Sequence, residues 1–408
     1  MRKYGLAVTG LALILCVLAP LGSVRGAAFA YTVNTTDDDV DVGGCQQAPT
    51  GDCTLREAIT DANGDGDVSN IAFNIPTSSG YNPSTGVWTI QLISALPALT
   101  ENGTGVMGST QTGNQGDTNP YGPEIVVNGA STYDCFDLRS AHNTIEGLAI
   151  SQCTYGIQIV GSGADHNTII ANYIGLNAQG TAASGNTETG IYIGNASDNT
   201  VGGGPPGARN VISGNGWEGV WIYGDGADRN DVSGNYIGTD SSGVFDVGNT
   251  YDGIRISGDA EDNDIGPDNI IAYNDMYGVS ISGGSTISNT VTQNSIHSSL
   301  WKGISLSGGA NRDLPAPSIA GPVCSSATGT APANATVELF TGPDVEGKTY
   351  LTTVSADVGG NWTASGFLAH GLYVTATATD LDGNTSEFSL DVDSDCARTY
   401  LPLIMKKY

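Results

Sequence analysis

Two carboxylates, Glu218 and Asp252, occupy the same place in an internal repeat, immediately before the glycine of a Gly-[Ile/Val]-x-[Ile/Leu] tetrad. When such repeats stack, equivalent side chains stand about 5 Å apart, which is the carboxyl separation used by retaining glycosidases. One carboxyl group then acts as nucleophile and the other as acid. Since stacking brings any two aligned carboxylates to this distance, the same spacing is also expected of two structural side chains.

Aromatic side chains surround this pair in the repeat. The middle positions of successive tetrads hold Tyr192, Trp221 and Arg255, which stacking places in a row on the outside of the fold. Further aromatic residues of the same region are Trp217, Tyr223 and Tyr251. Flat rings beside carboxylates and a guanidinium suit sugar rings, which bury apolar faces and form hydrogen bonds at their edges. We predict a carbohydrate-binding face here, and the alternative interpretation is a cross-strand ladder that stabilises the sheet.

A short acidic string is similar to the first half of a calcium-binding loop. Asp61, Asn63, Asp65 and Asp67 alternate around a glycine, and alternate oxygen ligands at a tight turn suit Ca²⁺. Position 12 of such a loop is Ala72, where a bidentate glutamate is expected, so the string is not a complete EF-hand. Two interpretations stay open: calcium binds here, or the chain needs no cofactor and the string is a solvated acidic turn.

The elements that position these residues come from a sequence repeat. Residues 156–199 recur 63 positions later as residues 219–262, and the tetrads inside this period are 25 to 34 residues apart. Each unit contains three short alternating apolar segments separated by glycine and asparagine, which indicates three strands and three turns. Neither a helical period nor a leucine-rich pattern runs through the units. We predict an all-β fold, a right-handed parallel β-helix of about nine coils.

Asparagine recurs at two fixed places in each unit. The two series are Asn143, Asn167, Asn199, Asn230, Asn263 and Asn289, and Asn172, Asn210, Asn235, Asn269 and Asn294. Stacked turn amides satisfy the backbone groups of the corners and one another. We therefore interpret both series as structural rather than as a polar site.

The N-terminus is typical of an exported protein. Residues 1–30 combine Arg2 and Lys3, an apolar run and small residues before the expected start of the mature chain near Tyr31. This pattern predicts a signal peptide and a secreted or cell-surface protein. No other segment is long enough to span a bilayer. The net charge of −28 at pH 7 excludes nucleic acid and anionic membranes as partners, because binding phosphate requires lysine and arginine.

Six cysteines follow the expected signal peptide and fall into neighbouring pairs. The pairs are Cys45 with Cys53, Cys135 with Cys153, and Cys324 with Cys396. Although six cysteines allow other pairings, locality and export favour these three disulfides. Zinc is the alternative, but no C-x-x-C string or histidine cluster accompanies the cysteines.

The string CTLREAI at residues 53–59 predicts a short capping helix, with Thr54 and Glu57 as its capping box. Together with IAFNIP, TIQLISALPALT and the GNYIGTD repeat, it resembles secreted bacterial β-helix proteins that begin with Cys-Ser-Leu-Arg-Glu-Ala-Ile. Thr54 replaces the serine and retains its capping chemistry. The resemblance extends from residue 31 to about residue 310. It implies the fold and a helix over the open end of the solenoid, but no reaction.

Beyond residue 312 the pattern changes to short alternating segments, which predict a β-sandwich. The stretch GGNWTASGFLAHGLYVTATATDLDGNTSEFS resembles bacterial immunoglobulin-like modules, which commonly serve as spacers or stalks. The final residues are interpreted as a sorting tag or as a frayed end. The expected parts are a signal peptide at 1–30, a cap at 31–70, the β-helix at 71–312, an Ig-like sandwich at 313–397 and a tail at 398–408.

Strings that mark enzymes of this fold are missing. The chain has no Gly-His-Gly of the polygalacturonases and no Asp-Pro-His-Asp of the alginate epimerases, and no histidine has an evident nucleophile partner. We therefore predict a non-catalytic cell-surface or matrix protein whose ligand is a polysaccharide or cell-surface glycan. The alternative is a polysaccharide lyase or glycoside hydrolase that acts on the outer face around Trp221.

Overall fold

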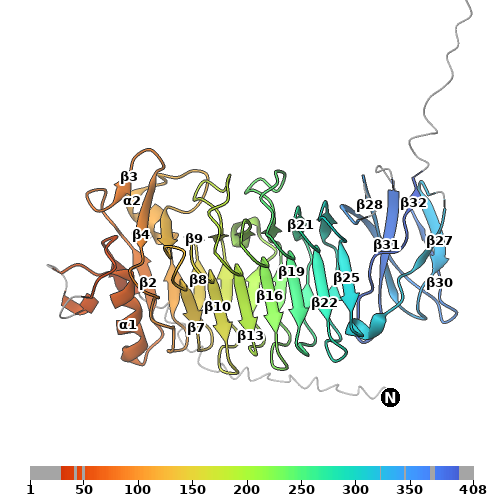
Figure 1. The fold of residues 1–408 in the computed structure, drawn as a ribbon, viewed down its shortest axis with the longest axis horizontal. Helices are drawn as coiled ribbons and strands as arrows, with labels where there is room; N and C mark the ends of the chain where they lie inside the picture. Colours follow the sequence, from red (N-terminus) through yellow and green to blue (C-terminus); the bar gives the residue numbers. More distant parts are fainter. Residues whose placement is uncertain are drawn as a thin grey trace, which may run out of the picture.

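Three sheets wind around the long axis of the molecule and form a parallel β-helix (Figure 1). The computed structural model describes residues 29–40, 44–47, 51–321, 323–343, 346–367 and 373–394. Residues 1–28 of the predicted signal peptide and the whole predicted tail lie outside this range. One sheet has nine strands that all pair in parallel, which confirms the expected number of about nine coils, and a second has eight such strands and one that pairs antiparallel.

The strands of each sheet follow the order of the coils. Sheet 1 contains β1 (Phe29–Val33), β2 (Asn70–Phe73), β5 (Gly105–Met107), β8 (Thr144–Glu146), β11 (Thr168–Ile170), β14 (Thr200–Gly202), β17 (Asp231–Ser233), β20 (Asp264–Ile265) and β23 (Thr290–Val291). Sheet 2 contains β3 (Tyr81–Asn82), β4 (Val87–Gln91), β6 (Ile125–Asn128), β9 (Leu148–Ser151), β12 (Tyr173–Ile174), β15 (Val211–Ile212), β18 (Tyr236–Ile237), β21 (Ile270–Ala272) and β24 (Ser295–His297). Sheet 3 contains β7 (Phe136–Leu138), β10 (Ile157–Val160), β13 (Ile191–Gly194), β16 (Val220–Tyr223), β19 (Ile254–Ser257), β22 (Val279–Ser282) and β25 (Ile304–Ser307).

Isoleucine and valine fill the inside of the coils. The two apolar positions of a tetrad, such as Val220 and Ile222, are fully buried, whereas the residue between them faces outward. The tetrad glycine is required by close packing, because a Cβ on Gly219 would lie 2.7 Å from the carbonyl oxygen of Gly253 on the next coil. The repeat thus specifies both the core and the spacing of the coils.

Buried asparagines stack along the corners as predicted. In one ladder the backbone N–H of Asn167 donates to Oδ1 of Asn199 (2.9 Å), and that of Asn199 donates to Oδ1 of Asn230 (3.0 Å). The second series behaves in the same way, from Asn172 to Asn294. A third ladder, which sequence reasoning missed, consists of Asn186, Asn215, Asn249 and Asn274. These amides replace backbone partners that a corner cannot supply.

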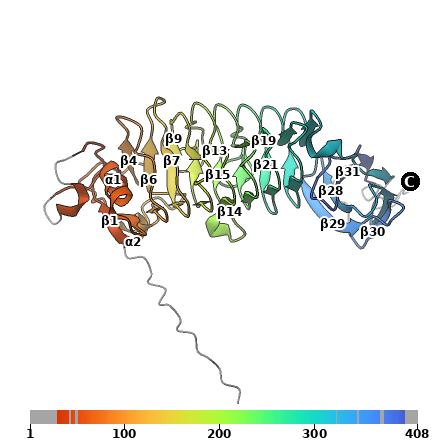
Figure 2. The same ribbon diagram turned by 90° about the horizontal axis from the view of Figure 1, so that it is seen from below.

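Helix α1 (Leu55–Asp65) covers the first coil at the N-terminal end of the solenoid (Figure 2). Thr54 accepts from the backbone N–H of Glu57, and the Glu57 carboxylate accepts from that of Thr54, which confirms the predicted capping box. Leu55, Ala58 and Ile59 are fully buried in the same core as the first strands. The helix therefore shields apolar side chains that a terminal coil otherwise exposes.

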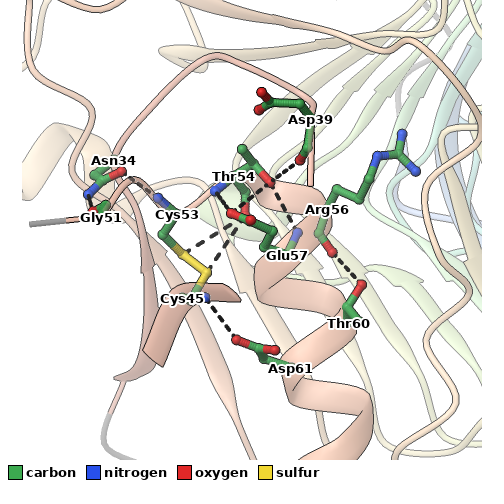
Figure 3. The surroundings of a disulfide bond; sticks show 10 residues. All are labelled: Asn34, Asp39, Cys45, Gly51, Cys53, Thr54, Arg56, Glu57, Thr60 and Asp61. Carbon is green, nitrogen blue, oxygen red and sulfur yellow. Dashed lines mark hydrogen bonds between the residues drawn. A yellow bond between two sulfur atoms is a disulfide. The ribbon is translucent and has the colours of Figure 1, made fainter. Parts of the chain in front are cut away.

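The segment before α1 is held by a disulfide between Cys45 and Cys53 (Figure 3). The backbone N–H of Cys45 donates to the Asp61 carboxylate (2.9 Å), and that of Cys53 donates to Oδ1 of Asn34 (2.8 Å). Cys135 and Cys153 form a second disulfide, so two of the three predicted bonds are confirmed. Cys324 is also disulfide-bonded. Its predicted partner, Cys396, lies outside the described residues.

Two antiparallel sheets follow the β-helix and enclose a core of their own. One contains β26 (Ser318–Ala320), β27 (Ser326–Thr330) and β30 (Asn361–Ser365). The other contains β28 (Thr336–Gly342), β29 (Thr349–Ser355), β31 (Tyr373–Thr379) and β32 (Val392–Asp393). The remaining short helices are η1 (Gly44–Gln47), α2 (Thr110–Gln115), η2 (Pro206–Ala208) and η3 (Ala310–Asp313). None of the described helices is long and apolar enough to cross a membrane.

This sandwich packs directly on the last coil (Figure 1). The alternating pattern of TSEFSLDV at residues 385–392 also favours a strand, but this segment is largely irregular. It lies between the last coil and β31, to which Ser386 and Ser389 donate backbone hydrogen bonds, and only Val392 belongs to a strand. Thr385 Oγ1 accepts from the backbone N–H of Val291 (2.9 Å), and Phe388 packs where a Cβ on Gly303 would lie. Lys302 pairs with Glu387 (2.8 Å). The prediction of a strand over this segment is therefore wrong.

Candidate functional site

The outer face of sheet 3 carries the side chains that the repeat predicted to align. The register partners on successive strands, from β10 to β25, are Gln158, Tyr192, Trp221, Arg255, Ser280 and Ser305. In the strands from β10 to β22 the neighbours on both sides are buried, whereas in β25 Ile304 is buried and Leu306 is half-buried. Because side chains alternate along a strand, these six side chains point outward in one row.

Aromatic rings form a cluster on this face at β13, β16 and the following corners. The ring centroid of Trp221 lies 5.3 Å from that of Tyr192 and 5.4 Å from that of Tyr223. Trp217 lies 6.4 Å from Trp221 and 6.3 Å from Tyr251. All four contacts are tilted or edge-to-face, as aromatic pairs prefer. The six candidate residues, Arg255 included, thus lie together, although their role as a ligand site remains a prediction.

Trp221 is less accessible than its aromatic neighbours. Its indole N–H donates to Ser257 Oγ (3.0 Å), and the guanidinium carbon of Arg255 lies 5.3 Å from its ring centroid. Trp217, by contrast, is 39% exposed and Tyr251 is 43% exposed. The accessible rings of the cluster are therefore those of the two corner residues and of Tyr223 on β16, rather than that of the central tryptophan.

Glu218 and Asp252 lie on adjacent coils beside these corner rings, since the backbone N–H of Gly219 donates to the carbonyl of Asp252 (3.0 Å). Both are buried, with 2% and 5% of their surface exposed. Nη1 of Arg255 lies 3.3 Å from Oε1 of Glu218. The Asp252 carboxylate accepts hydrogen bonds from Ser280 Oγ and from the backbone N–H of Tyr277. The pair is thus asymmetric, since only Glu218 has a direct cationic partner among these contacts.

The protonation of Asp252 is shifted by this environment. Burial raises the pKa of Asp252, and the neighbouring Glu218 charge raises it further, while hydrogen bonds from Ser280 and Tyr277 oppose both effects. A carboxyl group with a raised pKa beside one that is paired with an arginine is the arrangement that separates an acid from a base. Structural ion pairs shift pKa values in the same way, so the shift alone does not assign a reaction.

A groove of about 240 Å³ continues along the outer face from Arg255 to β25. We call it the sheet 3 groove. Its lining residues are Tyr251, Asp252, Arg255, Met276, Tyr277, Ser280, Ser282, Ser305 and Ser307. The floor consists of serine hydroxyls and one wall consists of corner side chains. Hydroxyls that donate and accept, beside flat rings, suit a ligand with many hydroxyl groups.

Sequence reasoning missed two residues of this wall, Met276 and Tyr277, and the adjoining Trp301, which contacts Tyr277. The sequence could have indicated them through their position at the corner. The residue two before each tetrad glycine is large in four successive repeats: Trp217, Tyr251, Met276 and Trp301. The backbone N–H of Met276 donates to the carbonyl of Tyr251 (3.2 Å), and that of Trp301 donates to the carbonyl of Met276 (3.0 Å). The rings of Tyr277 and Trp301 meet edge to face at 5.2 Å. Following the two corner positions, one and two residues before the tetrad glycine, through two further repeats would have found all three.

The predicted calcium ligands lie at the end of α1 and in the following turn. Asn63 Oδ1 accepts from the backbone N–H of Thr100 (2.8 Å), and the Asp65 carboxylate accepts from Tyr31, Asp67 and Ser69. Asp61 holds the backbone of Cys45 (2.9 Å). The described residues contain no group of three or more His, Cys, Asp or Glu side chains that could hold a metal ion. Calcium therefore remains an untested prediction, and the oxygens of these side chains already have hydrogen-bond partners.

One family model matches part of the solenoid. Residues 136–302 match the family described as periplasmic copper-binding protein (NosD). The match begins at β7 and ends just before β25, so it covers sheet 3 and less than half of the chain. Among curated proteins, none matches this chain. The matched segment agrees with the parallel β-helix that the strand order shows.

The described residues do not fit a copper centre of the kind the family description names. Copper binds histidine, methionine and cysteine side chains. The imidazoles of His142 and His166 stack at 5.1 Å on neighbouring corners, whereas His297 packs edge to face on Tyr273. Four of the cysteines form disulfides with one another. Because the soft and imidazole ligands of the described part do not converge, no metal chemistry follows from this match.

Proposed function

We propose that this chain is an exported β-helix protein that binds carbohydrate along the outer face of sheet 3. The observation that carries the proposal is the sheet 3 groove, where the rings of Tyr251 and Tyr277 stand beside a floor of serines and the exposed ring of Trp217 adjoins Tyr251. Rings cover the apolar faces of sugars, and hydroxyls and carboxylates satisfy their polar edges. Export is supported by the disulfides and by the family description as a periplasmic protein.

The direction of the groove specifies the shape of the ligand. Its lining comes from three successive strands, β19, β22 and β25, and the aromatic cluster extends it to β16 and β13. Neighbouring strands are about 4.8 Å apart, so the face from β13 to β25 is about 19 Å long. A chain of several sugar units that lies parallel to the solenoid axis matches this length. A single monosaccharide contacts only a fraction of it.

Cleavage of the bound chain is a second candidate function, favoured by the Glu218 and Asp252 pair. Asp252 has a raised pKa at the edge of the groove, and Glu218 contacts Arg255. In such a reaction Asp252 would donate a proton to the leaving oxygen, and the Glu218 carboxylate would act as the nucleophile. The absence of the motifs known from enzymes of this fold leaves binding as the first proposal.

A glycan array and a reducing-sugar assay on the same preparation test both functions. The binding proposal predicts retention of an oligosaccharide by the wild type and weaker retention by the Trp217→Ala variant. Release of reducing ends that is lost in Asp252→Asn would favour the enzyme instead. If no polysaccharide on a broad array is retained or cleaved, the carbohydrate proposal is wrong. Arg139→Ala is a suitable control, because its side chain pairs with Asp137 on β7, away from the groove.

A further inference from the structure

A second cavity, outside the sheet 3 groove, lies between the last coil and the sandwich. It measures about 370 Å³, which is within the range of sites for small ligands. Its lining residues are Trp301, Lys302, Gly303, Ile304, Glu346, Glu387, Phe388, Ser389, Leu390 and Asp391. Residues 301–304 belong to the β-helix and the others to the sandwich, so the cavity exists only because the two parts are docked together.

The cavity is positioned by contacts that fix both of its walls. Glu387 accepts from the Lys302 ammonium (2.8 Å) and from the backbone N–H of Leu306 (3.1 Å). Glu346 accepts from the backbone N–H of Ser299 (3.3 Å). These bonds join the sandwich to the corner of β25 and hold the carboxylates around an apolar floor.

The charge of the lining favours a cation. Glu346, Glu387 and Asp391 supply three carboxylates, and Lys302 supplies one ammonium, which leaves two excess negative charges when all four are ionised. Trp301 stands at the same site with 56% of its surface exposed. An indole face beside carboxylates attracts an ammonium group through the ring quadrupole and through direct charge.

The cavity also continues the sheet 3 groove. Trp301 lines the cavity, Tyr277 lines the groove, and their rings are in edge-to-face contact at 5.2 Å. A ligand that follows the corner aromatics from Trp217 would therefore reach Trp301 and then the carboxylates. This continuity favours a sugar unit over an isolated amine as the occupant.

We propose that the junction cavity is a terminal subsite of the carbohydrate site and binds a sugar unit that carries a free, protonated amine. This inference rests on the proposed function, because the cavity receives the end of a chain bound in the groove. The ammonium contacts the Asp391 and Glu346 carboxylates, and the sugar ring lies against Trp301. An N-acetylated unit has no charge at this position, so the cavity should bind it more weakly than the unit with a protonated amine.

Titration calorimetry with tetramers of glucosamine, fully deacetylated or fully N-acetylated, tests the inference on the complete chain. We expect the deacetylated tetramer to bind about tenfold more tightly at a pH below the amine pKa. Asp391→Asn should remove most of this preference, because the ammonium loses one of its carboxylate partners. Asp393→Asn is the matched control, because Asp393 is exposed on the neighbouring strand and does not line the cavity. The preference should also vanish above the amine pKa.

Equal affinity for the two tetramers, or a preference that Asp391→Asn leaves intact, would overturn the subsite. If a neutral oligosaccharide still binds in a manner that depends on Trp217, the proposed carbohydrate function survives without it. If the array and both tetramers give no binding, the function itself fails. If a lysine-containing peptide binds tightly and no glycan binds, the proposed sugar ligand is wrong and the cavity is a site for the amine of a protein side chain.

Discussion

Individual aromatic residues on sheet 3 have different roles because their neighbours differ. Trp221 is enclosed by Tyr192, Tyr223 and Arg255 and donates its N–H to Ser257. Such a ring stabilises the sheet through cross-strand contacts. The pattern of tetrads predicted where this ring lies, but not how much of it is covered, because coverage depends on the conformations of Tyr223 on the same strand and of Tyr192 and Arg255 on the adjacent strands.

We expect Trp221→Ala to lower the stability of the solenoid by about 2 kcal/mol, since several ring contacts and one hydrogen bond are lost. Thermal or denaturant unfolding of the purified protein measures this change. Trp217→Ala is the control, because Trp217 is more exposed and should lose less stability while it weakens glycan retention. Equal stability of the two variants would show that the enclosure of Trp221 contributes nothing.

The guanidinium of Arg56 is buried and hydrogen-bonded in the N-terminal cap. It forms two hydrogen bonds with the Asp38 carboxylate (3.0 and 2.7 Å) and donates to the carbonyl oxygens of Ser94 and Ala95 (2.8 and 2.7 Å). The pair is almost fully buried, with 9% and 0% of the two side chains exposed. The arginine of CTLREAI thus connects the cap helix to the loop after β4.

Removing one partner leaves a buried charge uncompensated, so Arg56→Ala should cost about 3–5 kcal/mol. Arg56→Lys should also destabilise the cap, because an ammonium cannot reproduce the fork of hydrogen bonds. Chemical denaturation followed at the N-terminal coils checks both. The exposed pair of Arg229 and Asp198 serves as the comparison, since Arg229→Ala should cost about 1 kcal/mol or less. Equal losses at the two sites would contradict this account of the cap.

At the scale of elements, two outward aspartates meet on sheet 1. Asp231 on β17 is the register partner of Asp264 on β20, and like charges opposite one another destabilise a sheet. Burial raises the pKa of Asp231, and burial together with the Asp231 charge raises that of Asp264. The folded state therefore binds these protons more tightly than the unfolded chain does.

This linkage predicts how stability changes with pH. The contribution of the two carboxyl groups is complete below the unfolded pKa of about 4 and is lost as the pH rises through the raised folded pKa values. Replacing both aspartates (Asp231→Asn and Asp264→Asn) removes the two titrating groups and adds a pair of stacked amides. We therefore expect the double variant to be more stable than the wild type at neutral pH. Unfolding curves from pH 4 to pH 7 measure the difference. The prediction would be contradicted if the difference in unfolding free energy between the double variant and the wild type did not grow with pH.

Much of the β-helix could be predicted from the sequence, because its coils repeat and a one-residue slip would turn every buried isoleucine outward. The register of Tyr192, Trp221 and Arg255 follows from this constraint alone. The ladder from Asn186 was missed because its members are not followed by the Asn-x-[Ile/Val] pattern of the other two series, although each stands four residues before a tetrad glycine. The irregular course of residues 385–391 could not be predicted, because their alternating pattern favours a strand, whereas residues 383–385 are held by a coil 93 to 96 residues earlier.

For the whole molecule, the sandwich closes the end of the solenoid that α1 leaves open (Figure 2). Asn311 continues the asparagine ladder at the backbone of Asn289 and donates to the carbonyl of Thr385 in the sandwich. Arg312 also pairs with Asp382. These contacts indicate that the sandwich caps the last coil.

A chain that ends after residue 312 should therefore aggregate or melt at a lower temperature than the full chain, because β23, β24 and β25 lose their covering. Size-exclusion chromatography and thermal unfolding of the truncated and complete proteins measure this. Arg312→Ala in the complete chain is a mild control that removes one exposed ion pair. A truncated protein as stable and monomeric as the complete one would show that the sandwich is a spacer.

The central claim is that sheet 3 binds an extended carbohydrate, and the most direct measurement is the affinity of one oligosaccharide series as a function of length. Using a glycan retained on the array, we expect the affinity to rise from the monomer to about four units and then level off, as the face from β13 to β25 fills. The Trp217→Ala and Tyr251→Ala variants should lower the affinity of the long oligomers by about 1–3 kcal/mol each. Affinity that is independent of length, or unchanged in both variants, would contradict the account.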